Sequence, residues 1–142
     1  MTTETIRLSL PPTDVGPMLA RAGARPLLVR LTGDQAFDLE LLITEITTNA
    51  VRQQGTDAVE DITLTIERGP RTMRVEASYL GTPLDPDGRG ATSDEARFGL
   101  AILDALTDAW GVERRGARTV VWFEAETRPY LALGPEDVGE TA

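Results

Sequence analysis

The chain has 142 residues, a formal net charge of −9 at pH 7, and neither cysteine nor histidine. This length suits one domain with a substantial core. The acidic balance argues against binding to the phosphate backbone of nucleic acids, which requires a cationic face. Without cysteine and histidine, disulfides, thiolate zinc sites and a histidine general base are excluded.

The beginning of the chain carries no targeting signal that we can identify. It lacks a basic segment followed by an apolar run, and no apolar stretch approaches membrane-spanning length. We therefore expect a cytoplasmic protein with no membrane partner, which associates with a basic surface on another protein.

The first predicted elements are a strand and a helix. Apolar residues alternate over residues 5–10, which predicts a half-buried strand at a sheet edge, closed by two prolines. A helix is predicted to follow from Asp14, and Gly23 and Pro26 are expected to kink or split it, leaving a short apolar piece at residues 27–31. Its predicted apolar face contains Val15, Met18, Leu19 and Ala22.

Residues 34–53 form the longest stretch with helical periodicity, and Asp34 is the expected N-cap. Glu45 and Asn49 interrupt its apolar pattern four residues apart, so they stack on one face of the helix. A carboxylate and an amide at this spacing can orient a water or hold a divalent cation, although such a pair also arises by chance. The predicted buried stripe contains Phe37, Leu39, Ile43, Ile46 and Ala50.

Two hairpins and one more helix are predicted downstream. Alternating residues at 62–66 and 73–79 flank a turn at 68–71, which indicates an antiparallel hairpin. Residues 81–97 are rich in glycine, proline and aspartate, and a loop of this length is usually functional or disordered.

A helix is predicted over residues 98–110, with Gly111 as its stop. A second hairpin is predicted from residues 111–115 and 118–126. We expect at least one of Trp110 and Trp122 to be buried.

This order of elements predicts an α/β (α+β) two-layer sandwich, with helices on one face of a mixed, mainly antiparallel sheet. Adjacent strands joined by hairpins exclude a parallel doubly wound sheet. We expect a single domain over residues 1–126 and an acidic tail over residues 127–142, disordered at its end.

Over residues 8–125 the chain resembles the serine-kinase anti-sigma factors of the histidine kinase-like (GHKL) ATPase superfamily, which has the Bergerat fold. The resemblance rests on several segments in the family's order and spacing: LLITEITTNAVRQ, MRVEASYLGTPL, FGLAILDALTDAWGV and GARTVVWFE. Several motifs in register are far more specific than Glu45 and Asn49 alone.

The resemblance implies a site for ATP and Mg²⁺. In such a site Glu45 would be the catalytic base that orients the attacking hydroxyl, Asn49 would ligate magnesium, and Thr119 would lie beside the adenine. Phosphoryl transfer requires mainly positioning and charge neutralisation, which these groups can supply. The residues at the implied nucleotide-binding positions are Asn49, Tyr79, Gly81, Arg97, Gly99, Leu100 and Thr119.

Some of these positions depart from the family pattern. Tyr79 stands where the family has the aspartate that reads the adenine amino group, and Pro83 and Arg97 each replace a motif glycine. A proline removes a backbone N–H and fixes φ where glycine permits close approach. Arg97 is also a cation in the loop that would cover the phosphates, and it could instead pair with nearby acidic residues.

Three functions remain open. The first is a kinase-like regulator that binds a sigma factor or an anti-sigma antagonist, with weak or no nucleotide binding, as Tyr79, Pro83 and Arg97 favour. The second is an active serine protein kinase, which the intact Glu45, Asn49 and Thr119 favour. The third is binding of a small ligand beneath residues 81–97. The resemblance also implies a tendency to form homodimers.

Overall fold

The computed structural model describes residues 3–55, 57–81 and 94–127, with only the backbone described for residues 94–98. Three helices and five strands follow one another along these residues. They are β1 (Glu4–Leu10), α1 (Val15–Leu28), α2 (Gly33–Gln54), β2 (Ile62–Arg68), β3 (Thr72–Leu80), α3 (Asp94–Leu106), β4 (Ala109–Arg115) and β5 (Arg118–Glu126).

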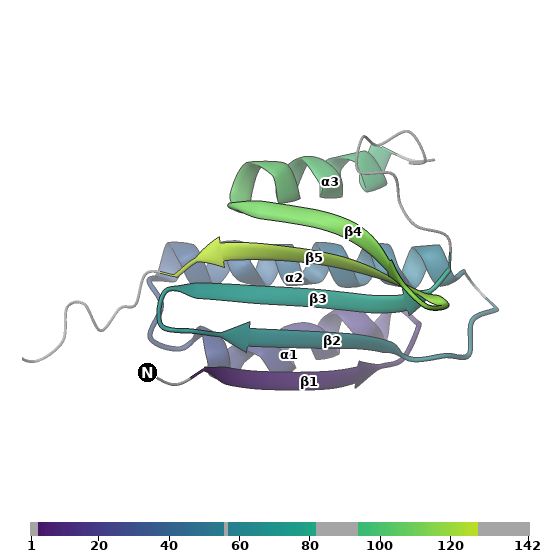
Figure 1. The fold of residues 1–142 in the computed structure, drawn as a ribbon, viewed down its shortest axis with the longest axis horizontal. Helices are drawn as coiled ribbons and strands as arrows, with labels where there is room; N and C mark the ends of the chain where they lie inside the picture. The colour runs from purple at the N-terminus through teal and green to yellow at the C-terminus, as the bar shows by residue number, and fades with distance from the viewer. Residues whose placement is uncertain (1–2, 56, 82–93, 128–142) are drawn as a thin grey trace, which may run out of the picture.

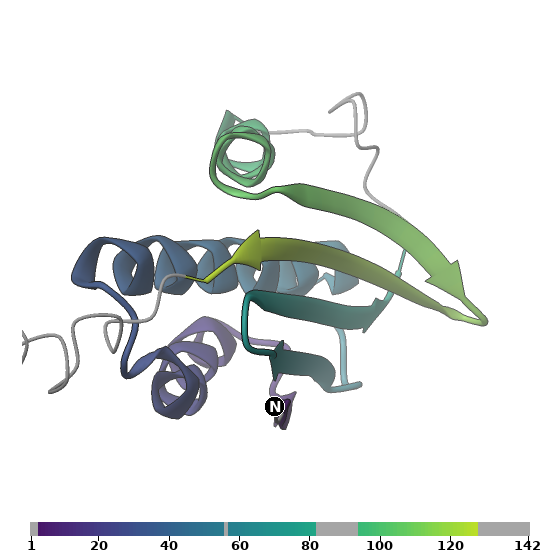
Figure 2. The ribbon, with the colours of Figure 1, turned by 60° about the vertical axis from the view of Figure 1, so that its left-hand side comes forward.

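The strands form one five-stranded sheet in the order β1-β2-β3-β5-β4, and every neighbouring pair is antiparallel. Helices α1 and α2 pack against one face of the sheet, whereas no described element covers the other face (Figures 1 and 2). Helix α3 lies beyond β4 and also contacts α2. The predicted two-layer fold is therefore confirmed, and β1 lies at a sheet edge as expected.

The core lies between the sheet and helices α1 and α2. Strand residues alternate between the two faces, and those that face the helices are fully or nearly fully buried. Among them are Leu64, Ile66, Met73, Val75, Ala77, Val121 and Phe123. Helix α2 contributes Leu39, Leu42, Ile43, Ile46 and Ala50 from its buried face.

Helix α1 differs from its prediction in two ways. It runs unbroken from Val15 to Leu28, through both Gly23 and Pro26. Gly23 is a packing position and not a break, since a Cβ there would lie 2.5 Å from Cδ1 of Leu8 on β1. In addition, the predicted apolar face is exposed, and the buried face consists of Gly16, Ala20, Ala24, Leu27 and Leu28.

Helix α2 begins earlier than predicted, and one of its apolar residues is outside the core. The N-cap is Thr32, whose side chain accepts a hydrogen bond from the backbone N–H of Gln35 at 3.4 Å, so Asp34 lies inside the first turn. Phe37 is 69% exposed, because it lies off the line that the buried leucines and isoleucines follow. The predicted burial of Phe37 is therefore wrong.

The last helix ends four residues before its predicted end. The backbone N–H of Asp108 donates to the carbonyl of Glu124, and Ala109 pairs with Glu124 in the β4–β5 ladder. Strand pairing thus takes Ala109 and Trp110 into β4, although they continue the helical spacing.

Neither tryptophan is buried as expected. Trp110 packs at the margin of the core, and Trp122 lies on the open face of the sheet, where the guanidinium of Arg74 stacks 4.4 Å from its ring centroid.

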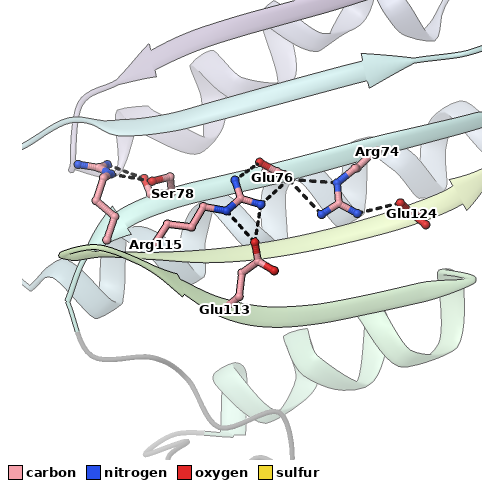
Figure 3. A network of polar contacts seen from close by, with 7 residues as sticks. Arg74, Glu76, Ser78, Glu113, Arg115 and Glu124 are labelled. Carbon is pink, nitrogen blue, oxygen red and sulfur yellow. Dashed lines mark hydrogen bonds and ion pairs between the residues drawn. The ribbon is translucent and has the colours of Figure 1, made fainter. Parts of the chain in front are cut away.

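The open face of the sheet carries a network of ion pairs (Figure 3). Arg74 on β3 contacts Glu76 at 3.0 Å and Glu124 of β5 at 2.8 Å. Arg115 of β4 contacts Glu76 at 2.9 Å and also pairs with Glu113. The charged side chains thus pair with one another across three neighbouring strands, which suits a face turned to solvent.

Candidate functional site

The candidate site begins with a row of side chains along α2. Glu45, Asn49 and Gln53 follow one another at intervals of four residues, so they lie on one face of the helix over two turns. The row runs from helix α3 at its Glu45 end to the end of β3 at its Gln53 end. The sequence-predicted stacking of Glu45 and Asn49 is therefore present in the fold.

The Glu45 end of the row is covered by α3. A Cβ added to Gly99 would lie 3.0 Å from Oε2 of Glu45, so the carboxylate rests against the helix backbone. Only glycine permits this approach without a shift of the carboxylate. Gly99 and Glu45, which the sequence places 54 residues apart, are thus in direct proximity.

Asn49 lies in the middle of the row and has an incomplete set of hydrogen bonds. Its side-chain nitrogen Nδ2 is buried and has no hydrogen-bond partner among the residues that the structure describes. Buried amide groups are usually paired, and leaving one without a partner costs about 1–3 kcal/mol. Asn49 lies between Glu45, which Gly99 approaches, and Gln53, which Gly81 approaches. Its unpaired side-chain nitrogen is the clearest sign of a ligand position in this region.

The other end of the row meets the end of the β3–β5 ladder. Tyr79 is fully buried and lies opposite Thr119 in the register of this ladder. The Thr119 hydroxyl donates to the carbonyl of Gly81 at 2.9 Å. Gly81 has φ of +149°, and a Cβ there would lie 2.9 Å from the carbonyl oxygen of Gln53, so this position requires glycine.

Two residues that the sequence did not single out hold this end of β3 in place. Arg114 of β4 donates to the carbonyl of Gly81 at 3.3 Å. Gln54 accepts from the backbone N–H of Leu80 at 2.8 Å and donates to the carbonyl of Glu60 at 2.8 Å. Leu80 and Gly81 are remote in the sequence from Gln54 and Arg114, so no local pattern could have indicated these two contacts.

The remaining predicted site residues are placed less fully. Leu100 is buried in the core at 8% exposure. Arg97 lies within α3, but its side chain lies outside the described residues, as does Pro83. The described residues include no group of three or more acidic side chains suited to a metal ion, so Asn49 stands as the one protein ligand predicted for magnesium.

A pocket of about 120 Å³ opens at the opposite end of α2 from Asn49. Leu39, Leu42, Leu106 and Ala125 form its apolar lining, and four acidic side chains and Gln35 complete it. It contains none of the predicted site residues. The proposed small-ligand cleft beneath residues 81–97 falls largely outside the described residues.

Comparison with known proteins identifies the family. Residues 9–125 match the model of the histidine kinase-like ATPase domain. The chain belongs to this family. An uncharacterised protein of Streptomyces coelicolor is 36% identical to it over 91 residues, which cover 63% of this chain and 86% of that protein.

Two solved structures share the fold of this histidine kinase-like domain. The RsbU and RsbW domains of Rv1364c from Mycobacterium tuberculosis match with a TM-score of 0.67 and 20% identity, over 89% of this chain and 33% of that one. The chain thus spans about a third of that larger protein. The SiaB–SiaC complex from Pseudomonas aeruginosa matches with a TM-score of 0.54 and 15% identity, over 85% and 89% of the two chains.

None of the described helices has the length and apolar character needed to cross a membrane.

Proposed function

We propose that this protein is a cytoplasmic regulator of the anti-sigma factor kinase type, which acts by binding another protein and binds ATP weakly. The observation that carries the proposal is the complete burial of Tyr79. The resemblance assigns this position to an aspartate that reads adenine. A phenol ring, packed into the core beside Gly81 and Thr119, offers one uncharged acceptor oxygen in place of the two oxygens of an ionised carboxylate, so it is a poorer partner for the adenine amino group.

The Thr119 hydroxyl supports the same conclusion. It donates a hydrogen bond to the carbonyl of Gly81, and this carbonyl also accepts one from Arg114. The end of β3 is thus closed by interactions within the protein, and a base would have to compete with them. The loss of a matched buried hydrogen bond to a ligand typically costs about 1–3 kcal/mol, so we infer that nucleotide binding is weak.

The partner we propose is a sigma factor or an anti-sigma antagonist. This class is supported by the likeness of the fold to a structure that contains an RsbW domain and to a SiaB–SiaC complex. The net charge of −9 favours a cationic surface on the partner.

A second candidate is an active serine protein kinase, which the unpaired amide of Asn49 favours. Magnesium-ATP would supply the phosphoryl group when bound. Glu45 would orient the acceptor hydroxyl, and the Asn49 amide would hold the metal. Glu45 and Asn49 fit the magnesium and phosphate part of the nucleotide, whereas Tyr79 does not fit the adenine. The two proposed functions therefore differ in the expected affinity for ATP and not in the residues that would act on its phosphates.

A titration with magnesium-ATP separates the two candidates. The unmodified protein should bind in the high micromolar range or more weakly, about 4–6 kcal/mol of binding free energy. The combined changes Tyr79→Asp, Pro83→Gly and Arg97→Gly should tighten binding about tenfold or more, and adding Asn49→Ala should remove that gain. Tight, magnesium-dependent binding by the unmodified chain would contradict the regulator and favour the kinase.

Because Tyr79→Asp places a carboxylate in the core, each variant is first checked for folding by circular dichroism. If the triple variant does not fold, the unmodified protein and Asn49→Ala alone still decide the question. Weak binding by both agrees with the regulator. Tight binding that Asn49→Ala abolishes agrees with the kinase.

A further inference from the structure

The two ends of the candidate site differ in whether their polar groups already have partners. At the end of β3, the Thr119 hydroxyl donates to the carbonyl of Gly81 at 2.9 Å, and Arg114 donates to the same carbonyl at 3.3 Å. The backbone N–H of Leu80 donates to Oε1 of Gln54 at 2.8 Å. These polar groups, at the end where the resemblance places the adenine, are therefore engaged within the fold.

The space at this end of the site is also taken by the protein. The ring of Tyr79 is fully buried in the core. A Cβ added to Gly81 would lie 3.5 Å from Cδ2 of Tyr79 and 2.9 Å from the carbonyl oxygen of Gln53, so strand β3 and helix α2 are in close approach here. A purine could enter only by displacing the ring, which would lose the apolar burial that the ring contributes.

The middle of the row on α2 is different, because it retains a donor that requires a ligand. The buried Nδ2 of Asn49 has no hydrogen-bond partner among the described residues, and an amide nitrogen can only donate. The oxygens of a phosphate are strong acceptors, whichever base the phosphate carries. Glu45, one turn away, adds a carboxylate, and Mg²⁺ in proteins takes one or two carboxylate or amide oxygens together with phosphate oxygens.

We propose that this site binds the magnesium-triphosphate group of a ligand and does not recognise the base. The ligand class is therefore any nucleoside triphosphate, or a triphosphate ester without a base, and Tyr79 is the residue that removes the preference for adenine. A ligand held at Asn49 gains no contact at Tyr79, whichever base it carries. This inference rests on the proposed function, since it names what the weakened nucleotide site still accepts.

Titrations of the unmodified protein at saturating magnesium, followed by phosphorus NMR, test the proposal. The three ligands are ATP, GTP and methyl triphosphate, which carries the triphosphate without ribose or base. Their dissociation constants should agree within about threefold, because the group that they share makes the contacts. A site that hydrogen-bonds the adenine amino group would instead bind ATP at least about tenfold more tightly than the other two ligands.

Substitutions at two positions test the two ends of the site separately. Asn49→Ala should weaken all three ligands by a similar factor, at least about tenfold, because it removes a donor to a charged group. Thr48→Ala is the matched control: it changes the adjacent half-buried side chain, about 100° around α2 from Asn49, and should leave the three constants unchanged. Tyr79→Asp should favour ATP over GTP at least about tenfold, because adenine has an amino group where guanine has a carbonyl.

The affinity for ATP and the ratio among the three ligands are separate readouts. Tight ATP binding contradicts the proposed regulator, whereas a preference of the unmodified protein for ATP overturns base-independent binding. If none of the ligands binds, or if Asn49→Ala leaves binding intact or Thr48→Ala weakens it, the inference is overturned and the regulator stands.

Circular dichroism checks that each variant is folded. A folded Tyr79→Asp protein that does not distinguish ATP from GTP overturns the role of Tyr79. If Tyr79→Asp does not fold, the comparison of the three ligands on the unmodified protein still decides the question.

Discussion

Glu76 is the residue at which the network on the open sheet face converges. Hydrogen bonds from Arg115 and then from Arg74 lower the pKa of Glu76 below its ordinary value, against the opposing effect of partial burial. The stabilisation that this carboxylate provides is therefore fully present above its unfolded pKa of 4.5 and is lost as the pH falls through the lower folded pKa.

Glu76→Gln should accordingly reduce the melting temperature at pH 7 and have little effect at strongly acidic pH. Because Arg115 is half exposed, solvent screens the pairs, and we expect a loss of about 1 kcal/mol, or about 3 °C. Melting curves of both proteins from neutral to acidic pH check this. A difference that is constant with pH would show that the change acts through packing and not through charge.

Gly81 offers a test of the geometry at the site. Gly81→Ala should destabilise the protein by about 1–3 kcal/mol, because φ is +149° and the added Cβ would lie 2.9 Å from the carbonyl of Gln53. Gly33→Ala is the control, since a Cβ there meets nothing within 4 Å, and it should be neutral or stabilise by at most about 1 kcal/mol. Equal melting temperatures for the two variants would contradict the close approach of α2 and β3.

The sequence could predict the relative position of candidate-site residues only where they lie on the same helix. Glu45 and Asn49 stack because they are four apart, and the sequence shows this directly. The proximity of Gly99 to Glu45 joins separate elements, so only the resemblance to a family brought these two residues together beforehand, and the approach of Gly81 to Gln53 was not predicted. The burial of Phe37 was mispredicted because apolar character does not decide which face of a helix meets the core.

Among the elements, α1 depends on a cap supplied by a strand. Arg68 of β2 donates to the carbonyls of Leu27 at 2.7 Å and Val29 at 3.0 Å. Arg68→Ala should cost about 1–2 kcal/mol, because it leaves carbonyls at the end of the helix without a charged donor. Chemical denaturation measures the loss, and Arg71→Ala, which changes an exposed arginine in the turn after β2, should change stability by less than about 0.5 kcal/mol.

Element types were predictable from periodicity, whereas their ends depended on contacts across the fold. Both hairpins follow from alternation and turn residues. The end of α3 was predicted too late because Ala109 and Trp110 fit a helical spacing. In the fold they instead pair with β5 and belong to β4. The break expected at Gly23 is absent because Leu8 of β1 packs against the glycine and the helix remains continuous.

At the scale of the whole molecule, we predict that residues 1–127 fold without the acidic tail. Every described core residue lies between Leu10 and Ala125. The last described residue, Thr127, donates a backbone hydrogen bond to the carbonyl of Arg71 at 2.8 Å. A chain that ends at Thr127 should melt within about 2 °C of the full protein. A larger fall would show that residues 128–142 belong to the folded domain.

The order of strands in the sheet also has a consequence for the folding kinetics of the chain. The β2–β3 and β4–β5 pairs are hairpins of neighbours in sequence, whereas β3 and β5 join Leu80 to Arg118 across 37 intervening residues. Closing that separation costs chain entropy before any contact repays it. We therefore expect the docking of the two hairpins to limit the folding rate, so that trimming Val75 or Phe123 at the β3–β5 seam slows refolding more than an equally destabilising change in α1.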